Sequence, residues 1–139
     1  MKRRVVVTGL GAITPIGNSI NSFWNSVKEG KNGIEKITCF DTEDFKVKVA
    51  AEVKDFNAEE YLGKKDAKRL DRFIQFALIS AKECIRDSNI DLDSIDRERI
   101  GVIFSSGIGG LITIEEQMTN LITRGPNRVS PLAIPTIIS

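Results

Sequence analysis

The stretch that most constrains this chain is residues 4–17, which read RVVVTGLGAITPIG. Val5 to Val7 are β-branched, suit a pleated surface and have no polar residue between them. A strand that is apolar on both faces belongs in the middle of a sheet covered on both sides. Gly9 and Gly11 follow, and glycines beside a strand indicate close approach by another backbone or by a ligand. We therefore expect a central strand whose far end passes close to a second element or a bound molecule.

Composition excludes several classes of protein. The 139 residues suffice for one ordinary domain, and the net charge of +1 gives no global attraction to nucleic acid or anionic membrane. No apolar run approaches the ~18 residues that a spanning helix needs, and the basic start lacks the apolar core of a signal peptide. We expect a cytoplasmic protein. The sequence has no histidine, so residues 1–139 alone supply no Cys–His, Ser–His or His–metal chemistry.

Helical periodicity recurs in three segments. The first begins near Ile20, with Ser19 as N-cap and Gly30 just past its end. The longest is expected at residues 71–88, where a stripe of small side chains indicates that another element packs close to the middle of the helix. A third is expected at residues 111–122.

Two further segments are interpreted as strands. Residues 47–53 alternate apolar and polar side chains, which is typical of a strand that has one solvent-exposed face and lies near the edge of a sheet. Residues 100–106 form a second largely apolar strand, while residues 30–44 and 89–98 are turn-rich connections. Strands alternating with helices favour an α/β layered domain and permit parallel neighbours.

The pattern Gly9-x-Gly11 partly matches the dinucleotide-binding fingerprint, G-x-G-x-x-G running directly into a helix. Here Thr14 takes the third glycine position, and Pro15 to Gly17 delay the helix. Because a lone glycine pattern has many false positives, a dinucleotide-binding domain of an oxidoreductase is kept only as an alternative.

Two other motifs each allow a structural and a functional interpretation. Residues 105–110, SSGIGG, are either a flexible strand-to-helix turn or the wall of a ligand site. The basic cluster at residues 64–69 is either a solvated helix face or a docking surface for an acidic partner. Cys39 and Cys84 have no imidazole to activate them, so neither is expected to be a nucleophile.

Six spaced blocks together resemble a known family. They are RRVVVTGLGAITPIGNS at residues 3–19, FDT at 40–42, VKDFN at 53–57, LDRFIQFAL at 70–78, SSGIGGL at 105–111 and SPLAIPTII at 130–138. In register over nearly the whole chain, they resemble the elongating β-ketoacyl-[acyl carrier protein] synthases. The resemblance implies the thiolase-like αβαβα layered fold of the α/β class. Residues 1–139 would form the N-terminal part of its first half, truncated, with the remainder of the enzyme absent.

By this resemblance the protein is an acyltransferase that condenses acyl groups with malonyl-[acyl carrier protein] in fatty acid elongation, as a homodimer. Its partner would be acyl carrier protein, whose phosphopantetheine arm carries the substrates. No metal or other cofactor, no nucleic acid and no membrane is implied. The family's catalytic cysteine and two histidines would lie beyond Ser139, so we expect no catalytic residue in this segment and no activity from it alone.

The resemblance also assigns the walls of an acyl pocket to Gly107, Ile108 and Ala133. Ile108 would be a gate whose rotamer sets the usable chain length. Ala133 stands where the family usually has a bulkier aromatic, which allows a longer or branched acyl chain.

A basic surface that meets the acidic carrier protein would comprise Lys65, Lys68, Arg69 and Arg128. Asn127 replaces a basic residue there, which would weaken docking somewhat. A non-catalytic module that only binds carrier protein stays open as another alternative function.

Overall fold

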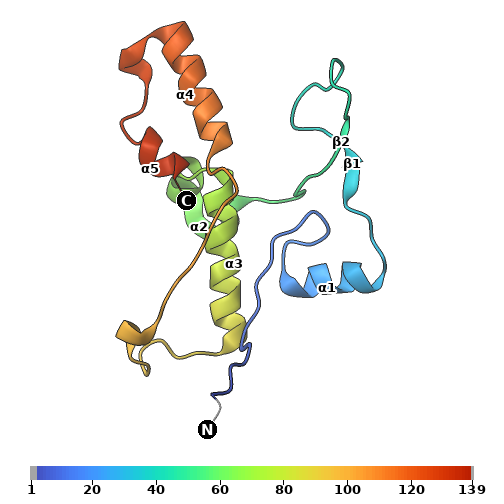
Figure 1. Cartoon of the computed structure of the whole chain (residues 1–139), viewed down its shortest axis with the longest axis vertical. Coiled ribbons are helices and arrows are strands. Elements are labelled where there is room, and N and C mark those ends of the chain that lie inside the picture. Colours follow the sequence, from blue (N-terminus) through green and yellow to red (C-terminus); the bar gives the residue numbers. More distant parts are fainter. Residues whose placement is uncertain (1–2, 139) are drawn as a thin grey trace. The chain divides into compact units, whose positions relative to one another are not determined.

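In the computed structural model, which describes residues 3–138, the chain forms two compact units. Unit 1 comprises the described residues up to 57 together with residues 79–90, and unit 2 comprises residues 58–78 and those from 91 onward. The regular secondary structure of residues 3–138 consists of helices and one small sheet (Figure 1), so the structure is of the mixed α/β class that the sequence predicts.

The helix α1 (Ile20–Lys28) of unit 1 has both of its predicted ends. Ser19 Oγ accepts a hydrogen bond from Ser22 N at 3.2 Å, and Ser22 Oγ accepts one from Ser19 N at 3.0 Å, which is a capping box. Gly30 has a φ of +67°, the left-handed conformation that commonly follows a helix end. Local sequence is therefore sufficient to define this helix.

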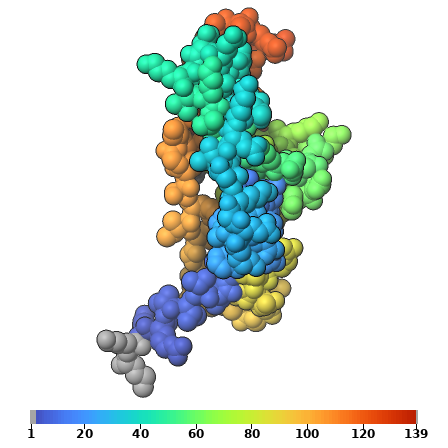
Figure 2. Space-filling model, turned by 90° about the vertical axis from the view of Figure 1, so that its right-hand side faces the viewer, coloured from blue at the N-terminus to red at the C-terminus, as the bar shows by residue number. Residues whose placement is uncertain are grey.

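The only sheet among residues 3–138 is the antiparallel pair of β1 (Ile34–Lys36) and β2 (Val49–Ala51), in which Glu35 faces Ala50. Figures 1 and 2 show this hairpin rising from the end of α1, with the connecting loop at its tip. β2 confirms the strand predicted at residues 47–53 in a shorter form. The interpretation of residues 30–44 as connection alone was wrong, because three exposed residues of β1 pair with β2 without any apolar alternation to reveal them.

Two predicted strands are absent from the described residues. Val5, Val6 and Val7 form no ladder, and their exposed fractions are 94%, 66% and 80%. Residues 100–106 likewise form no strand. A central strand needs partners that satisfy its backbone N–H and C=O groups on both sides. In unit 1 the two strands pair with each other, and the described part of unit 2 contains no strand, so neither segment has such a partner in its own unit.

The helices agree with the sequence predictions better than the strands do. Gly63, with a φ of +77°, interrupts the helical segment α2. The predicted helices at residues 71–88 and 111–122 are both confirmed, the first contributing residues to both units. The elements after residue 57 are α2 (Ala58–Arg69), α3 (Arg72–Ser88), η1 (Arg97–Arg99), α4 (Leu111–Arg124), η2 (Pro126–Arg128) and α5 (Ala133–Ile137).

Burial is sparse in both units. Among the described residues, the buried apolar side chains are Ile79 and Ala133, which are 5% and 9% exposed. Large apolar side chains such as Ile103 and Ile122 are exposed instead. Apolar surface of this kind commonly serves association with other protein surface.

Candidate functional site

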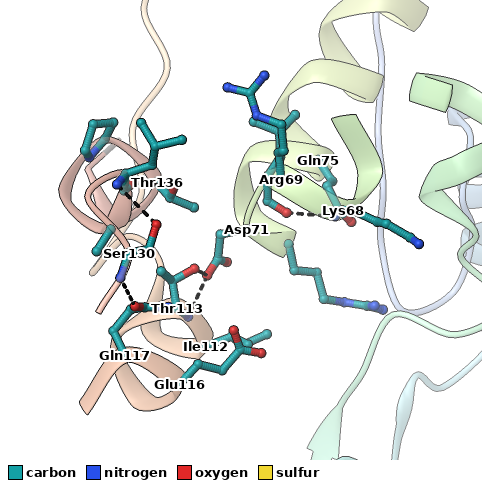
Figure 3. A pocket seen from close by; sticks show the side chains of 15 residues that line it. Lys68, Arg69, Asp71, Gln75, Ile112, Thr113, Glu116, Gln117, Ser130 and Thr136 are labelled. Carbon is teal, nitrogen blue, oxygen red and sulfur yellow. Dashed lines mark hydrogen bonds between the residues drawn. The ribbon is translucent and has the colours of Figure 1, made fainter. Parts of the chain in front are cut away.

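Unit 2 contains a cavity of about 610 Å³ (Figure 3). Its wall comes from the end of α2, the start of α3, the first turns of α4 and the segment that enters α5. Ala133, a predicted acyl-pocket residue, lines this cavity together with Lys68 and Arg69, two predicted carrier-binding residues. The cavity therefore joins parts of both predicted sites.

Asp71 lies in the wall of the cavity and is 8% exposed. Its Oδ1 accepts a hydrogen bond from Phe73 N at 3.4 Å, as expected of an N-cap of α3. Its Oδ2 accepts from both the backbone N–H and the hydroxyl of Thr113, at 3.0 and 2.7 Å (Figure 3). Thr113 is in the first turn of α4, whose N-cap residue, Gly110, offers no side chain. One carboxylate thus closes two helix N-termini, where negative charge is favourable.

The turn at residues 106–110 is held at two points. Within the turn, Gly109 N donates to Ser106 Oγ at 2.9 Å. At its end, Gly110 N donates to Ile137 O of α5 at 3.0 Å. Gly109 has a φ of +87°, and a Cβ there would lie 2.2 Å from Ile137 O. Glycine is therefore required at this position both by conformation and by the approach of α5.

The three predicted acyl-pocket residues occupy two linked segments. Ala133 is the first residue of α5 and is buried, whereas Gly107 and Ile108 lie exposed in the turn, Ile108 with 70% of its surface accessible. The hydrogen bond from Gly110 to Ile137 connects the turn with α5. Gly107 and Ile108 do not line the 610 Å³ cavity, so their role in an acyl pocket stays a prediction.

All four predicted carrier-binding residues belong to unit 2 and are exposed. Lys65, Lys68 and Arg69 follow the break in α2, and Arg128 ends η2. In Figure 3 the Arg69 guanidinium extends away from Asp71. These cations are therefore accessible to a partner, and their function stays a prediction.

Three polar residues that build the cavity wall were not predicted from the sequence: Asp71, Thr113 and Gln117. Gln117 follows Thr113 by one helical turn, and its Oε1 accepts from Ser130 N at 2.7 Å. One signal was present, since Asp71 directly precedes a predicted helix and aspartate is a preferred N-cap. Its second contact, to a residue 42 positions away, depends on the tertiary structure.

In unit 1, the element that approaches Gly9 and Gly11 is α3. A Cβ on Gly9 would lie 2.3 Å from Cys84 O, and one on Gly11 would lie 2.0 Å from Ser80 O. Ser80 and Cys84 are four residues apart in α3, so the two glycines pack against successive turns of this helix. Cys84, one of the small side chains of α3, contacts this segment, and its Sγ donates a hydrogen bond to Gly9 O at 3.3 Å. α3 therefore packs directly against these glycines and takes the space that a dinucleotide would need.

Two carboxylates of α3 hold the same segment. Asp87 Oδ2 accepts from Leu10 N at 2.9 Å, and Glu83 Oε2 accepts from Ala12 N at 2.9 Å. The other Glu83 oxygen, Oε1, accepts from Ile20 N at 2.9 Å, at the start of α1. Carboxylates of α3 thus accept hydrogen bonds from the backbone N–H groups that follow the predicted strand at residues 5–7.

The hairpin carries one group with a strongly shifted pKa. The Glu52 carboxylate accepts hydrogen bonds from Thr38 Oγ1 at 2.8 Å, from Thr38 N at 3.1 Å and from Cys39 N at 3.2 Å. Hydrogen bonds from the Cys39 side chain and from Thr38 lower the pKa of Glu52 from 4.5 to about 2. Glu52 is therefore a charged anchor for the end of this loop near neutral pH.

Residues 3–138 contain neither a metal-binding cluster nor a membrane-spanning helix. No group of three or more His, Cys, Asp or Glu in this range is arranged to hold a metal ion. None of the helices in the same range combines the length and apolar character needed to cross a membrane.

Solved structures of ketosynthases share this fold. The ishigamide ketosynthase/chain length factor matches with a TM-score of 0.81 and 28% identity, over 99% of this chain and 34% of that one. A complex of a type II polyketide acyl-carrier protein with its ketosynthase, AntDE:AntF, matches with a TM-score of 0.76 and 24% identity over 99% and 35%. A β-ketoacyl synthase from Burkholderia phymatum STM815 gives 0.75 and 21% over 98% and 34%. The predicted thiolase-like fold class is therefore confirmed.

The sequence profile of the β-ketoacyl synthase N-terminal domain matches residues 2–139, and the chain belongs to this family. It is 47% identical over 138 residues to 3-oxoacyl-[acyl-carrier-protein] synthase 2 of Synechocystis sp.. It is 46% identical over 136 residues to the protein of the same name from Staphylococcus aureus strain COL. These matches cover 99% and 98% of this chain but 33% of each relative.

Proposed function

We propose that residues 1–139 form the N-terminal part of a 3-oxoacyl-[acyl-carrier-protein] synthase, which condenses acyl groups with malonyl-[acyl carrier protein] in fatty acid elongation. The identity of 46–47% to two such synthases over nearly the whole chain carries this proposal. The chain spans one third of those relatives, so the activity proposed is that of the longer protein. Residues 1–139 alone contain no histidine and should be inactive, because they lack the usual proton carrier. A cytoplasmic location and a homodimer belong to the same proposal.

Gly107, Ile108 and Ala133 are proposed to line the acyl pocket of that protein. Each CH₂ of an acyl chain gains ~0.8 kcal/mol on leaving water, so an apolar wall is what this substrate needs. Ile108 supports the proposal because it is an exposed apolar side chain on a turn whose backbone is anchored at Gly109 and Gly110. Such a side chain can change rotamer while its backbone stays in place.

Lys65, Lys68, Arg69 and Arg128 are proposed to dock acyl carrier protein, which would deliver substrates on its phosphopantetheine arm without any metal. All four are exposed cations of unit 2, and Lys68 and Arg69 border the cavity that contains Ala133. A ketosynthase of the same fold has been solved in complex with its acyl-carrier protein, which supports this partner. Opposite charge on the two surfaces would speed their association and make it depend on salt.

The activity is tested in a chimaera in which residues 1–139 replace the matching third of the Staphylococcus aureus relative. We expect the chimaera to condense acyl and malonyl substrates carried on acyl carrier protein, and residues 1–139 alone to show neither condensation nor malonyl decarboxylation. A chimaera that folds like its parent but does not condense would refute the proposed function. Turnover by residues 1–139 alone would refute the assignment of the chemistry to the remainder of the protein.

Carrier docking is tested by charge reversal. Lys68→Glu should weaken binding of acyl carrier protein to residues 1–139 at least about tenfold at low salt, with a smaller effect at high salt. Lys46→Glu makes the same change of charge on an exposed residue of unit 1 and is the control. Equal affinities for the two variants would contradict the proposed surface. Carrier binding by a chimaera that does not condense would instead favour the alternative of a non-catalytic binding module.

A further inference from the structure

We infer that Asp71 is a positioning residue that sets acyl chain-length selection by anchoring the turn that carries Ile108; this rests on the proposed function. Asp71 Oδ2 receives two hydrogen bonds from Thr113, in the first turn of α4. The same oxygen lies against buried Gly110, where a Cβ would come within 2.9 Å of it. The carboxylate therefore contacts α4 at the point where the turn passes into the helix.

A short series of anchored residues connects this junction with Ile108. Gly110 precedes α4 directly and donates its N–H to Ile137 O, while Gly109 donates to Ser106 Oγ. The backbone on the C-terminal side of Ile108 is thus fixed by α5 and, through Thr113, by Asp71. The Ile108 side chain itself stays 70% exposed. A fixed backbone with a free side chain allows rotamer changes to set pocket depth reproducibly.

The junction has no spare polar group that would suit it to bind a ligand of its own. No buried side-chain nitrogen or oxygen among residues 3–138 lacks a hydrogen-bond partner. The Asp71 oxygens are used by two helix N-termini, at Phe73 and Thr113. Its role is therefore to hold α4 and the turn in one arrangement, and a change there should alter selectivity more than chemistry.

The test removes one hydroxyl. Thr113→Val keeps the size and backbone N–H of Thr113 and deletes the 2.7 Å hydrogen bond to Asp71, whereas Thr113→Ser keeps that bond. Thr123→Val deletes a hydroxyl from the same helix whose 2.6 Å bond stays within α4, at Thr119 O, and is the control. In the chimaera, selectivity is measured as kcat/KM for the preferred acyl chain divided by kcat/KM for a chain four carbons longer. This ratio should fall about fivefold in Thr113→Val, because a hydrogen bond contributes ~1 kcal/mol net. The Ser variant and the control should keep the ratio of the wild type.

A second measurement does not need activity. In the chimaera, hydrogen exchange of the segment 106–113 should become faster in Thr113→Val and stay unchanged in Thr123→Val. An active wild-type chimaera whose ratio is the same in Thr113→Val would overturn the inference while leaving the proposed function intact. A folded wild-type chimaera without condensing activity would overturn both the proposed function and the role in selectivity. Unchanged exchange in Thr113→Val would overturn the anchoring itself.

Discussion

Replacing Gly11 by alanine tests the packing of the N-terminal segment against α3. The new Cβ would lie 2.0 Å from Ser80 O and 2.9 Å from Cys84 N, and both atoms are helix backbone that cannot rotate away. The segment must move outward, and overpacking of this kind costs ~1–3 kcal/mol. The movement would also break the hydrogen bond from Ala12 N to Glu83, which is worth ~1 kcal/mol net. We expect the free energy of unfolding to fall by about 2–4 kcal/mol.

The assay is urea unfolding of the chimaera followed by circular dichroism, with equal m-values required for the comparison. Gly101→Ala is the matched control, because a Cβ at Gly101 meets nothing within 4 Å and its φ is not left-handed. Its free energy of unfolding should stay within about 0.5 kcal/mol of the wild type. A change as small as this in Gly11→Ala, with the Ala12 amide still protected from exchange, would refute the reasoning.

Three further outcomes are expected. The hydrogen bonds in the folded chain lower the pKa of Glu52 from its ordinary value of 4.5 to about 2, so its charge stabilises the hairpin fully above pH 4.5, and this stabilisation is lost as pH falls from 4.5 to 2. Glu52→Gln should remove that acid dependence, as measured by NMR shifts of the hairpin against pH; an unchanged profile would contradict it. Ser26→Ala deletes a 2.6 Å bond to Ile16 O and should lower the free energy of unfolding of the chimaera by about 1 kcal/mol in urea, whereas no change would mean that the bond contributes nothing. Residues 1–139 alone should self-associate in light scattering, because Val5 and Ile103 are more than 90% exposed, and a monodisperse monomer would disprove this.

The predictions that the structure confirms are those that depend on a single segment. α1 follows from its own residues, since Ser19 caps one end and Gly30 takes the left-handed conformation after the other. α3 follows from its apolar spacing, and its small side chains correctly indicated a close neighbour. Gly9 and Gly11 indicated the same contact from the other side, although the residue pattern did not decide between a second backbone and a ligand.

The predictions that fail depend on partners. Val5 to Val7 have strong strand propensity, but a strand exists only when another strand satisfies its backbone, and unit 1 provides none for them. β1 was missed because its exposed side chains give no strand pattern. It is a strand only because its backbone pairs with β2.

The residues alone determined the family, the capped helix α1 and the need for close packing at two glycines, because these signals lie within short stretches of chain. Only the tertiary structure decided that α3 is the neighbour of Gly11, and that Asp71 closes α4 as well as α3. A hydrogen bond between residues 42 positions apart leaves no periodic trace in a sequence, because its geometry exists only after the intervening chain has folded.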